Sequence, residues 1–250
     1  MSLGQHLLEL RKRLFRAAAA IVLGAVIGWL LSESIWAALR QPIYAIIEAQ
    51  QRNAEINYPD ITSAFDLKLK IAFYVGIVVS SPVWLYQVFA FLMPGLTRGE
   101  KKYVYGFVLS AVPLFLAGCA AGWYVLPQIV GLMTSFAPKE DAAFINAQNY
   151  LDFTLKLMVA IGVAFVLPVF LVLLNFASVI SAKSIIKSWK IAVLVIILFT
   201  AIATPAADVI SMFMLAIPMV LLYFIAYGIA YLHDRRADRR ALILEREIAL

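Results

Sequence analysis

The chain has 250 residues, of which 64% are hydrophobic and 14% are charged. A soluble globular domain is closer to half apolar and a quarter charged, so this composition excludes a water-soluble protein and indicates a membrane protein. The net charge of +6 fits basic cytoplasmic loops better than nucleic-acid binding, because no basic patch carries interleaved aromatic residues or a known binding motif.

The residues that support metal or catalytic chemistry are scarce. The single cysteine, Cys119, lies inside an apolar run, and the two histidines, His6 and His233, lie at opposite ends of the chain. This distribution predicts no intramolecular disulfide, no metal site and no cofactor. The sequence contains no HExxH, GxSxG, CxxC or glycine-rich phosphate motif, so we do not expect an enzyme.

The first predicted elements are an interfacial helix and a membrane span. Leucines at helical spacing give residues 2–16 an apolar stripe, and the helix continues into a first span at about residues 15–36. Within this span Gly24 and Gly28 form a face of small residues suited to close helix packing. The polar segment over residues 37–66 predicts an ordered loop outside the membrane.

The second and third spans follow from two long charge-free runs. The second span is predicted at about residues 68–91, with a kink at Pro82. The next run is longer than one span needs, and Pro113 and Pro127 divide it. It therefore predicts a third span at about residues 104–126, followed by a short helix on the outer surface.

Three further spans complete the membrane domain. They are predicted at about residues 150–176, 191–204 and 209–232, and the last two are short. Short spans are accommodated by local thinning of the bilayer, so we expect a thinner membrane beside them. The chain thus consists of one transmembrane domain, residues 1–232, and a charged cytoplasmic tail, residues 233–250.

The distribution of charge predicts the orientation of these six spans. The N-terminus, the second loop, the fourth loop and the tail hold 15 of the 21 basic residues. Basic residues collect in cytoplasmic loops, so we predict an all-α membrane protein with both termini in the cytoplasm. Ahead of the tail, only two acids fall on this cytoplasmic side, Glu9 and Glu100, which makes them candidates for holding a positively charged ligand.

Five segments together carry a resemblance to a known family. They are HLLELRKRL at 6–14, SSPVWLYQVFAFLMPGLTRGEK at 80–101, GWYVLP at 122–127, FVLPVFLVLLN at 165–175 and TPAADVISMFMLAIPM at 204–219. In wording and order they resemble TatC, the large polytopic subunit of the twin-arginine protein translocase. The HDRRADRR tail is similar to that of actinobacterial members.

The resemblance implies a fold, a location and a set of partners. Members of the TatC family have six transmembrane helices in a cupped, glove-like bundle in the bacterial plasma (inner) membrane, with both ends cytoplasmic. They recognise signal peptides with two consecutive arginines on folded precursor proteins. They act with TatB-type and TatA-type single-span subunits, as homo-oligomers within the receptor complex, and the proton-motive force drives transport.

Two glutamates match the positions that the family uses to bind the signal peptide, Glu9 and Glu100. An arginine presents a planar fork of donors that pairs bidentately with a carboxylate, so two adjacent arginines need two acceptors. Each residue also has a simpler explanation. Glu9 could pair with Lys12 or Arg13 along the helix, and Glu100 could be a charge at the N-terminus of the third helix.

Other motif positions divide into two groups. Those assigned to the signal-peptide site are Arg11, Arg13, Phe91, Pro94, Gly95 and Leu96. Those assigned to partner contacts or to structure are Pro42, Tyr124, Thr204, Pro205 and Asp208. Arg11 and Arg13 serve equally as orientation signals, and Asp208 serves equally as the N-cap of the sixth helix. The loop residues after Phe91 shape the turn in either case.

The chain departs from the family pattern inside the membrane. Family members often carry polar residues at the positions of Val166, Met212 and Phe224, and all three are apolar here. The polar intramembrane cluster that engages the TatA-type subunit in the family is therefore largely missing. Either the partner contact has shifted, or the polarity comes from the partner.

A secondary transporter or ion channel for a small solute is the alternative function. Such a protein needs buried charges or broken helices along a path through the membrane. The chain shows no obvious internal repeat, and the central parts of spans two to six carry no acid. A signal-peptide receptor that is a core translocase subunit therefore fits the sequence better.

Overall fold

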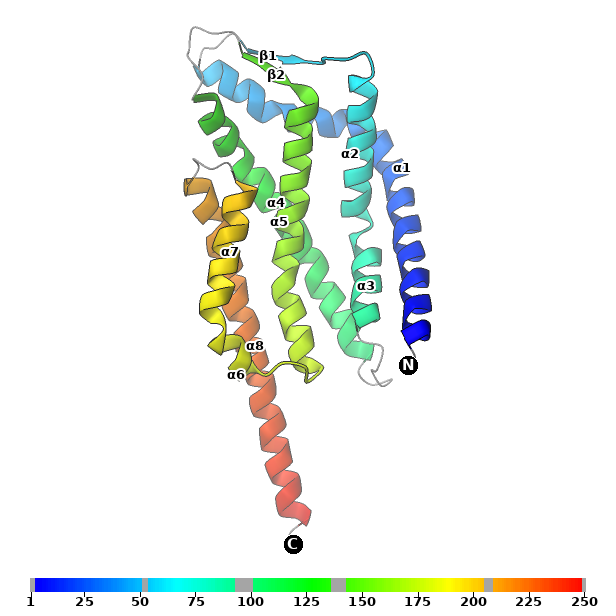
Figure 1. Cartoon of the computed structure of the whole chain (residues 1–250), viewed down its shortest axis with the longest axis vertical. Coiled ribbons are helices and arrows are strands. Elements are labelled where there is room, and N and C mark those ends of the chain that lie inside the picture. Colours follow the sequence, from blue (N-terminus) through cyan, green and yellow to red (C-terminus); the bar gives the residue numbers. More distant parts are fainter. Residues whose placement is uncertain (1–2, 51–53, 93–100, 136–142, 205–208, 249–250) are drawn as a thin grey trace.

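The structure is a computed structural model that describes residues 3–50, 54–92, 101–135, 143–204 and 209–248. Its elements in chain order are α1 (Leu3–Gln50), β1 (Ala54–Asn57), α2 (Ser63–Val79), α3 (Ser81–Leu92), α4 (Lys101–Ser135), β2 (Ala143–Asn146), α5 (Ala147–Phe176), α6 (Ala182–Lys187), α7 (Trp189–Ala203) and α8 (Val209–Ile248). The helices stand side by side, and the start of α1 and the end of α8 lie towards the same end of the bundle (Figure 1).

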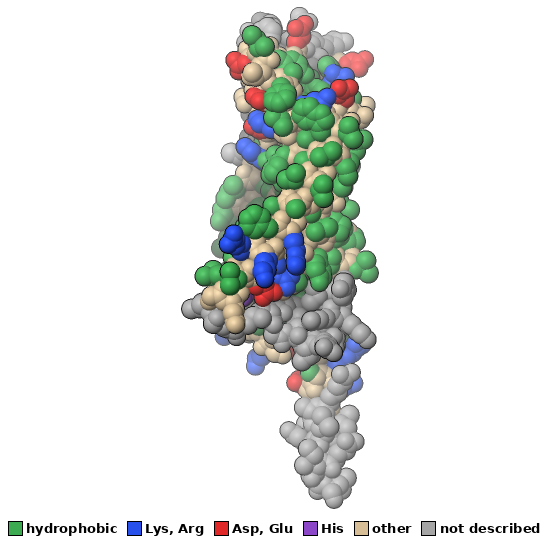
Figure 2. Space-filling model, turned by 90° about the vertical axis from the view of Figure 1, so that its right-hand side faces the viewer, with side chains coloured by type: hydrophobic (Ala, Val, Ile, Leu, Met, Phe, Trp, Pro, Cys, Tyr) green, Lys and Arg blue, Asp and Glu red, His purple; other side chains and the backbone are tan. Residues whose placement is uncertain are grey.

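Most of these helices have the length and composition of membrane spans. In the described ranges, four helices are long and apolar enough to cross a membrane alone, namely α1, α4, α5 and α8. Helices α2 and α3 pass the same test as a bent pair, and α7 is a shorter apolar helix of 15 residues. Apolar side chains cover the middle of the face shown in Figure 2, as expected for a surface in contact with lipid.

Helix α1 is longer than the sequence predicts. It continues through Pro42 to Gln50, so the prediction of a loop from residue 37 is wrong for this part of the segment. Its last turns bend across the upper end of the bundle (Figure 1). Two buried aromatic residues explain why this stretch stays ordered: Tyr150 donates to the Leu39 carbonyl at 2.7 Å, and Trp36 packs edge-on against the Tyr150 ring.

Small residues allow α1 and α2 to touch backbone to backbone. A methyl group on Gly24 would lie 2.7 Å from the carbonyl oxygen of Gly76, and one on Gly28 would lie 2.6 Å from that of Ala72. These separations are shorter than van der Waals contact, so any larger side chain would force the helices apart. The predicted packing face on the first span is therefore confirmed.

A break at Ser80 separates α2 from α3. The two helices are bent by 58° at this point, next to Pro82, whose ring removes a backbone donor. The indole of Trp84 donates to the Ile77 carbonyl at 2.9 Å and so satisfies an acceptor beside the break. The predicted kink in the second span is confirmed.

Helix α4 runs without interruption from Lys101 to Ser135. It includes both Pro113 and Pro127, so the prediction that these prolines separate a span from a short outer helix is wrong. In an apolar environment a broken helix leaves backbone groups unpaired, which favours keeping the helix despite proline. Close packing on α5 also holds it, since a methyl group on Gly118 would lie 2.8 Å from the Cα of Gly162.

A two-stranded parallel sheet links the segment after α1 to the segment before α5, at the end of the bundle away from the termini. Strand β1 follows α1, and strand β2 precedes α5, with Ala54 opposite Ala143 and Asn57 opposite Asn146. The side chain of Asn146 then caps α5 by accepting from the Asn149 amide at 3.0 Å. The sheet therefore ties the bent end of α1 to the start of α5.

Helix α8 continues well beyond the bundle. It extends to Ile248, so the prediction that the sixth span is short is wrong. The segment from residue 233 continues this last membrane helix and is not a separate tail (Figure 1). Asp234 anchors it where it leaves the bundle: its carboxylate accepts from the Asn175 amide at 2.9 Å and from the Ala182 backbone amide at 2.7 Å. One side chain thus links α8 to the end of α5 and the start of α6.

We expect Asp234→Ala to lower the thermal stability of the purified protein. The change leaves the Ala182 N–H without its acceptor and leaves the buried Asn175 amide with only its bond to the Ile180 carbonyl, at a cost of about 2–3 kcal/mol for bonds to a charged group. The measurement is the midpoint of thermal unfolding in detergent. Asp238→Ala, an exposed acid one turn further along α8, is the matched control and should leave the midpoint unchanged. Equal midpoints for both variants would contradict the anchoring role.

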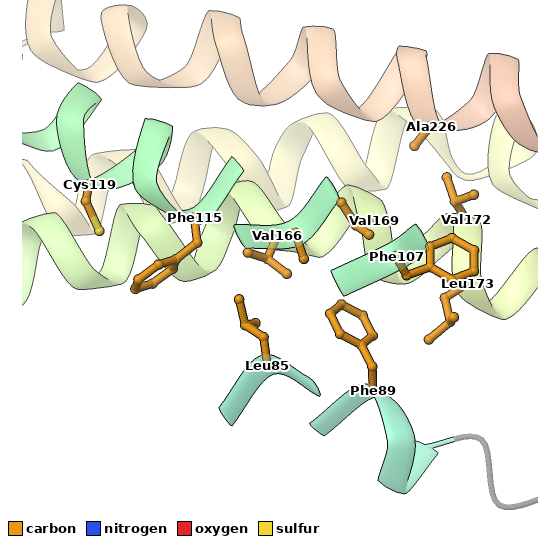
Figure 3. Packing of buried hydrophobic residues seen from close by; sticks show 11 residues of the cluster. Leu85, Phe89, Phe107, Phe115, Cys119, Val166, Val169, Val172, Leu173 and Ala226 are labelled. Carbon is orange, nitrogen blue, oxygen red and sulfur yellow. The ribbon is translucent and has the colours of Figure 1, made fainter. Parts of the chain in front are cut away.

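The largest apolar cluster lies where α3, α4, α5 and α8 converge (Figure 3). Phe89 of α3 and Phe115 of α4 are fully buried there, and Leu85 points into the same region. Burial of an aromatic side chain contributes roughly 1.5–3 kcal/mol, so this cluster fixes α3 firmly. The opposite side of α3 faces α1, and this contact forms the candidate site.

Candidate functional site

Glu9 lies on α1 near the end of the bundle where the chain begins, and it is paired within its own helix. Arg13, one turn further along, donates to Oε1 of Glu9 from Nε at 3.0 Å and from Nη2 at 2.6 Å. The Glu9 side chain is 25% exposed and that of Arg13 is 20% exposed. The sequence allowed Glu9 to pair with Lys12 or with Arg13, and in the structure it pairs with Arg13.

A second helix completes the surroundings of this ion pair. Nη1 of Arg13 also points at Oε1 of Gln87 on α3, a long hydrogen bond of 3.4 Å. Gln87 is buried although its side chain is polar. One turn further along α3, the ring of Phe91 stacks on His6 with 4.5 Å between ring centroids. Glu9 and Arg13 therefore lie beside α3 and not on an open helix surface.

This arrangement holds a guanidinium group, that of Arg13. Glu9 supplies a carboxylate, Gln87 supplies a neutral acceptor, and Arg13 fills the space between them. Arg13 uses only Oε1 of the carboxylate. Partial burial reduces solvent screening, so such a pair is stronger than one on an open surface. Basic side chains gather around an acidic one near the lower end of the face in Figure 2.

The sequence did not single out Gln87 or His6 as parts of this site. The available signal for Gln87 was a lone amide within a charge-free apolar run, because a polar group buried in lipid normally has a partner. The partner could not be named, because Arg13 is 74 residues away in the chain. His6 carried no comparable signal.

Arg11 does not contribute to the contact between Glu9 and α3. Its side chain is exposed, and its guanidinium carbon lies 5.8 Å from the centroid of the Phe15 ring. Two positions apart on a helix, residues 9 and 11 project in nearly opposite directions. Arg11 therefore lies on the outer surface of α1. This position agrees with the alternative role of a basic residue that sets the orientation of the protein in the membrane.

Several predicted residues lie outside the described part of the chain. These are Glu100, Pro94, Gly95 and Leu96, which precede α4 in the sequence, and Pro205 and Asp208, which precede α8. The role of Glu100 as the second acceptor therefore stays a prediction. So does the role of Asp208 as a helix cap.

The remaining motif residues lie away from Glu9. Pro42 is inside α1, and Tyr124 is 67% exposed on α4, so its ring is on the surface of the bundle. Thr204 is buried at the end of α7 and donates to the Thr200 carbonyl at 2.9 Å. Thr204 therefore closes the last turn of α7, which is a structural role.

The three apolar departures from the family pattern occupy different surroundings. Val166 is buried in the cluster shared by α3, α4, α5 and α8, and it packs as an ordinary core residue (Figure 3). Met212 is half-buried, and Phe224 is 40% exposed on α8. The ring centroids of Phe224 and of Trp189 on α7 are 6.5 Å apart. None of these three side chains offers a hydrogen bond to a partner helix.

Ion pairs lie near the opposite end of the bundle. Lys70 of α2 contacts Asp152 of α5 at 2.9 Å, and Lys68 contacts Glu33 of α1 at 3.2 Å. Each pair connects two different helices, and the Lys70–Asp152 pair connects residues 82 positions apart, so both pairs are assigned a structural role. In the described residues, no group of three or more His, Cys, Asp or Glu side chains is arranged to hold a metal ion.

Comparison with known proteins places the chain in a family. The sequence model of the family described as "Sec-independent protein translocase protein (TatC)" matches residues 5–218. The protein named TatC from Xylanimonas cellulosilytica is 44% identical over 240 residues, which cover 96% of this chain and 87% of that protein. TatC from Rothia mucilaginosa is 37% identical over 241 residues, covering 96% and 82%. Both are actinobacteria, in agreement with the resemblance of the tail.

A solved structure shows the same fold. The crystal structure titled "Twin Arginine Translocase Receptor- TatC" superposes with a TM-score of 0.73 and 29% sequence identity, covering 91% of this chain and 98% of that one. The superposition therefore covers most of the chain. This chain belongs to the TatC family, the multi-pass membrane subunits of the twin-arginine protein translocase.

Proposed function

We propose that this chain receives twin-arginine signal peptides of folded precursors at the cytoplasmic face of the membrane and nucleates the translocation complex. Glu9 and Glu100 are the two acceptors, one for each arginine. TatB-type and TatA-type subunits complete the complex, in which several copies of this chain act together, and the proton-motive force drives transport. The crystal structure with a similar fold is titled a receptor, which supports this role.

The proposed topology places Glu9 on the cytoplasmic side. Helix α1, the α2–α3 pair, α4, α5, α7 and α8 each cross the membrane once, so both termini lie on one side. That side carries most of the basic residues of the chain, and such residues collect in the cytoplasm. Helix α7 is about 22 Å long, less than the ~30 Å hydrocarbon core, so the bilayer is thinner beside it.

The observation that carries the proposal is the guanidinium bound to Glu9. The chain itself supplies an arginine to this carboxylate, with contacts of 3.0 Å and 2.6 Å, beside the buried Gln87. A group that accepts an internal arginine in this geometry also accepts the arginine of a peptide. Lysine lacks the planar fork and cannot reproduce the arrangement of donors.

The test is a direct binding measurement with the full chain in lipid nanodiscs. A fluorescent peptide with two adjacent arginines should bind at least roughly tenfold more tightly than the same peptide with two lysines, because the lysines lose the fork of donors. Photocrosslinking from position 6, one turn before Glu9 on the same side of α1, should yield an adduct with the arginine peptide and leaves the Glu9 carboxylate in place. Equal affinities for the two peptides would contradict the carboxylate model.

We expect Arg13→Gln to increase the affinity for the twin-arginine peptide by roughly two- to fivefold. An incoming arginine displaces Arg13 from Glu9, and a partly exposed pair within a helix is worth about 0.5–1 kcal/mol. The measurement is the dissociation constant of the fluorescent peptide. Arg16→Gln, which removes the same charge from an exposed position one turn away, separates the lost pair from the lost charge. A weaker peptide affinity in Arg13→Gln would show that Arg13 helps to hold the peptide.

A further inference from the structure

A groove opens between α5, α6 and α7 on the surface of the bundle. Its volume is about 540 Å³, within the range of ligand pockets in proteins. Leu167, Leu171 and Leu174 of α5 form one wall, and Val195 of α7 contributes to the other. The walls are almost entirely apolar, so the groove accommodates a hydrocarbon chain.

The groove has one polar end. Ser184 of α6 and Ser188, which separates α6 from α7, both contribute to its lining. These serines lie towards the end of the bundle from which α8 extends, the end that carries the start of α1 (Figure 1). The Ser184 hydroxyl lies 3.0 Å from the Ser181 hydroxyl and shares a hydrogen bond with it, and the Ser188 hydroxyl is the other polar side-chain group contributed by these two serines.

Three lysines form a stripe beside the polar end. Lys183 and Lys187 are four residues apart on α6, which places them on one side of that helix, and Lys190 follows in the first turn of α7, two residues after Ser188. All three side chains are exposed. The structure pairs none of them with an acid in the ranges that it describes. The nearby carboxylate of Asp234 is engaged by the Asn175 amide and the Ala182 backbone.

The length of the groove indicates what fills it. From Ala164 to Leu174 its α5 wall rises by about 15 Å, because a helix rises 1.5 Å per residue. That is half of the ~30 Å hydrocarbon core, the depth of a single leaflet. A partner helix that crosses the membrane would need a groove of twice this length, whereas one acyl chain of a lipid needs only a leaflet.

We propose that this groove is a binding site for an anionic phospholipid of the same leaflet. One acyl chain lies along Leu167, Leu171 and Leu174, and the phosphate lies at Ser184 and Ser188 within reach of the lysine stripe. Basic pockets between membrane helices on the cytoplasmic side bind anionic headgroups for the same electrostatic reason. The proposal requires only that the chain is in a membrane, so it does not depend on signal-peptide recognition.

The test compares lipid classes on the full-length purified protein by native mass spectrometry. Phosphatidylglycerol should stay bound at collision energies that remove phosphatidylcholine, which has the same acyl chains but no net charge. Replacing Lys183, Lys187 and Lys190 by glutamine should weaken phosphatidylglycerol binding at least roughly tenfold, because each basic residue near a headgroup contributes roughly a fivefold attraction and three are removed together.

Two further variants locate the lipid. Replacing Arg235, Arg236 and Arg239 of α8 by glutamine removes the same charge from exposed positions outside the groove and should leave binding unchanged. Leu171→Trp fills the groove without changing the charge and should weaken binding of both lipids. Equal losses in the lysine and arginine variants, or full binding in Leu171→Trp, would overturn the site. Equal retention of the two lipid classes by the unmodified protein would also overturn the proposed lipid site. A partner helix would then be the better candidate to occupy the groove.

Discussion

Glu9→Gln combined with Glu100→Gln is expected to abolish binding of a twin-arginine peptide. Each substitution removes a charged acceptor but keeps the shape of the side chain. A hydrogen bond to a charged group contributes about 2 kcal/mol, or roughly 30-fold in affinity, so the double variant should lose roughly a thousandfold. The measurement is the dissociation constant of the fluorescent peptide for the full chain in nanodiscs. Each single variant should show an intermediate loss if each glutamate holds one arginine.

The control for this prediction removes two carboxylates elsewhere. Glu48→Gln with Glu55→Gln makes the same change in net charge at exposed positions near the other end of the bundle. It should leave peptide affinity unchanged, and both double variants should keep the thermal midpoint of the unmodified protein. Unchanged peptide affinity in the Glu9/Glu100 double variant would rule out the two carboxylates as the arginine acceptors.

Gly76→Ala is expected to destabilise the bundle more than any surface substitution. A methyl group on Gly76 would lie 2.7 Å from both the Ile21 carbonyl oxygen and the Ala25 backbone nitrogen. Backbone atoms cannot rotate away, so α1 and α2 must separate, and overpacking of this kind costs about 1–3 kcal/mol. The measurement is the thermal midpoint in detergent. Because α1 carries Glu9, peptide affinity should fall as well.

Gly228→Ala is the matched control in another membrane helix. Nothing lies within 4 Å of a methyl group at this position. Since alanine favours a helix over glycine by about 1 kcal/mol, the control should be neutral or slightly stabilising. If Gly76→Ala behaved like Gly228→Ala, α1 and α2 would not be in backbone contact at this position.

The parts of the fold that the sequence predicted are those that depend on local composition. Gly24 and Gly28 marked a helix-packing face, and Pro82 marked a kink, because both effects act within one or two turns. The errors at Pro42, Pro113 and Pro127 share one cause. A proline signals a helix end in water, but tertiary contacts and an apolar environment keep these helices continuous.

The candidate site was predicted in part for the same physical reason. The charge distribution identified Glu9, and helical spacing identified Arg13 as a possible partner, since both signals lie within one helix. Gln87 and the stacking of His6 on Phe91 depend on how α1 meets α3, which residue spacing does not encode. The anchor at Asp234 was missed for this reason too, because it joins three helices.

The bent end of α1 has a consequence for the route of the cargo. A folded protein of 100 residues has a radius of gyration of about 13 Å, far wider than any gap between packed helices. In the described part of the bundle, fully buried side chains such as Phe89, Phe115 and Ile161 fill the spaces between helices. The last turns of α1 cross the end of the bundle that lies opposite the start of the chain (Figure 1). Under the proposed function, a folded precursor therefore passes along the outer surface of this bundle and not between its helices.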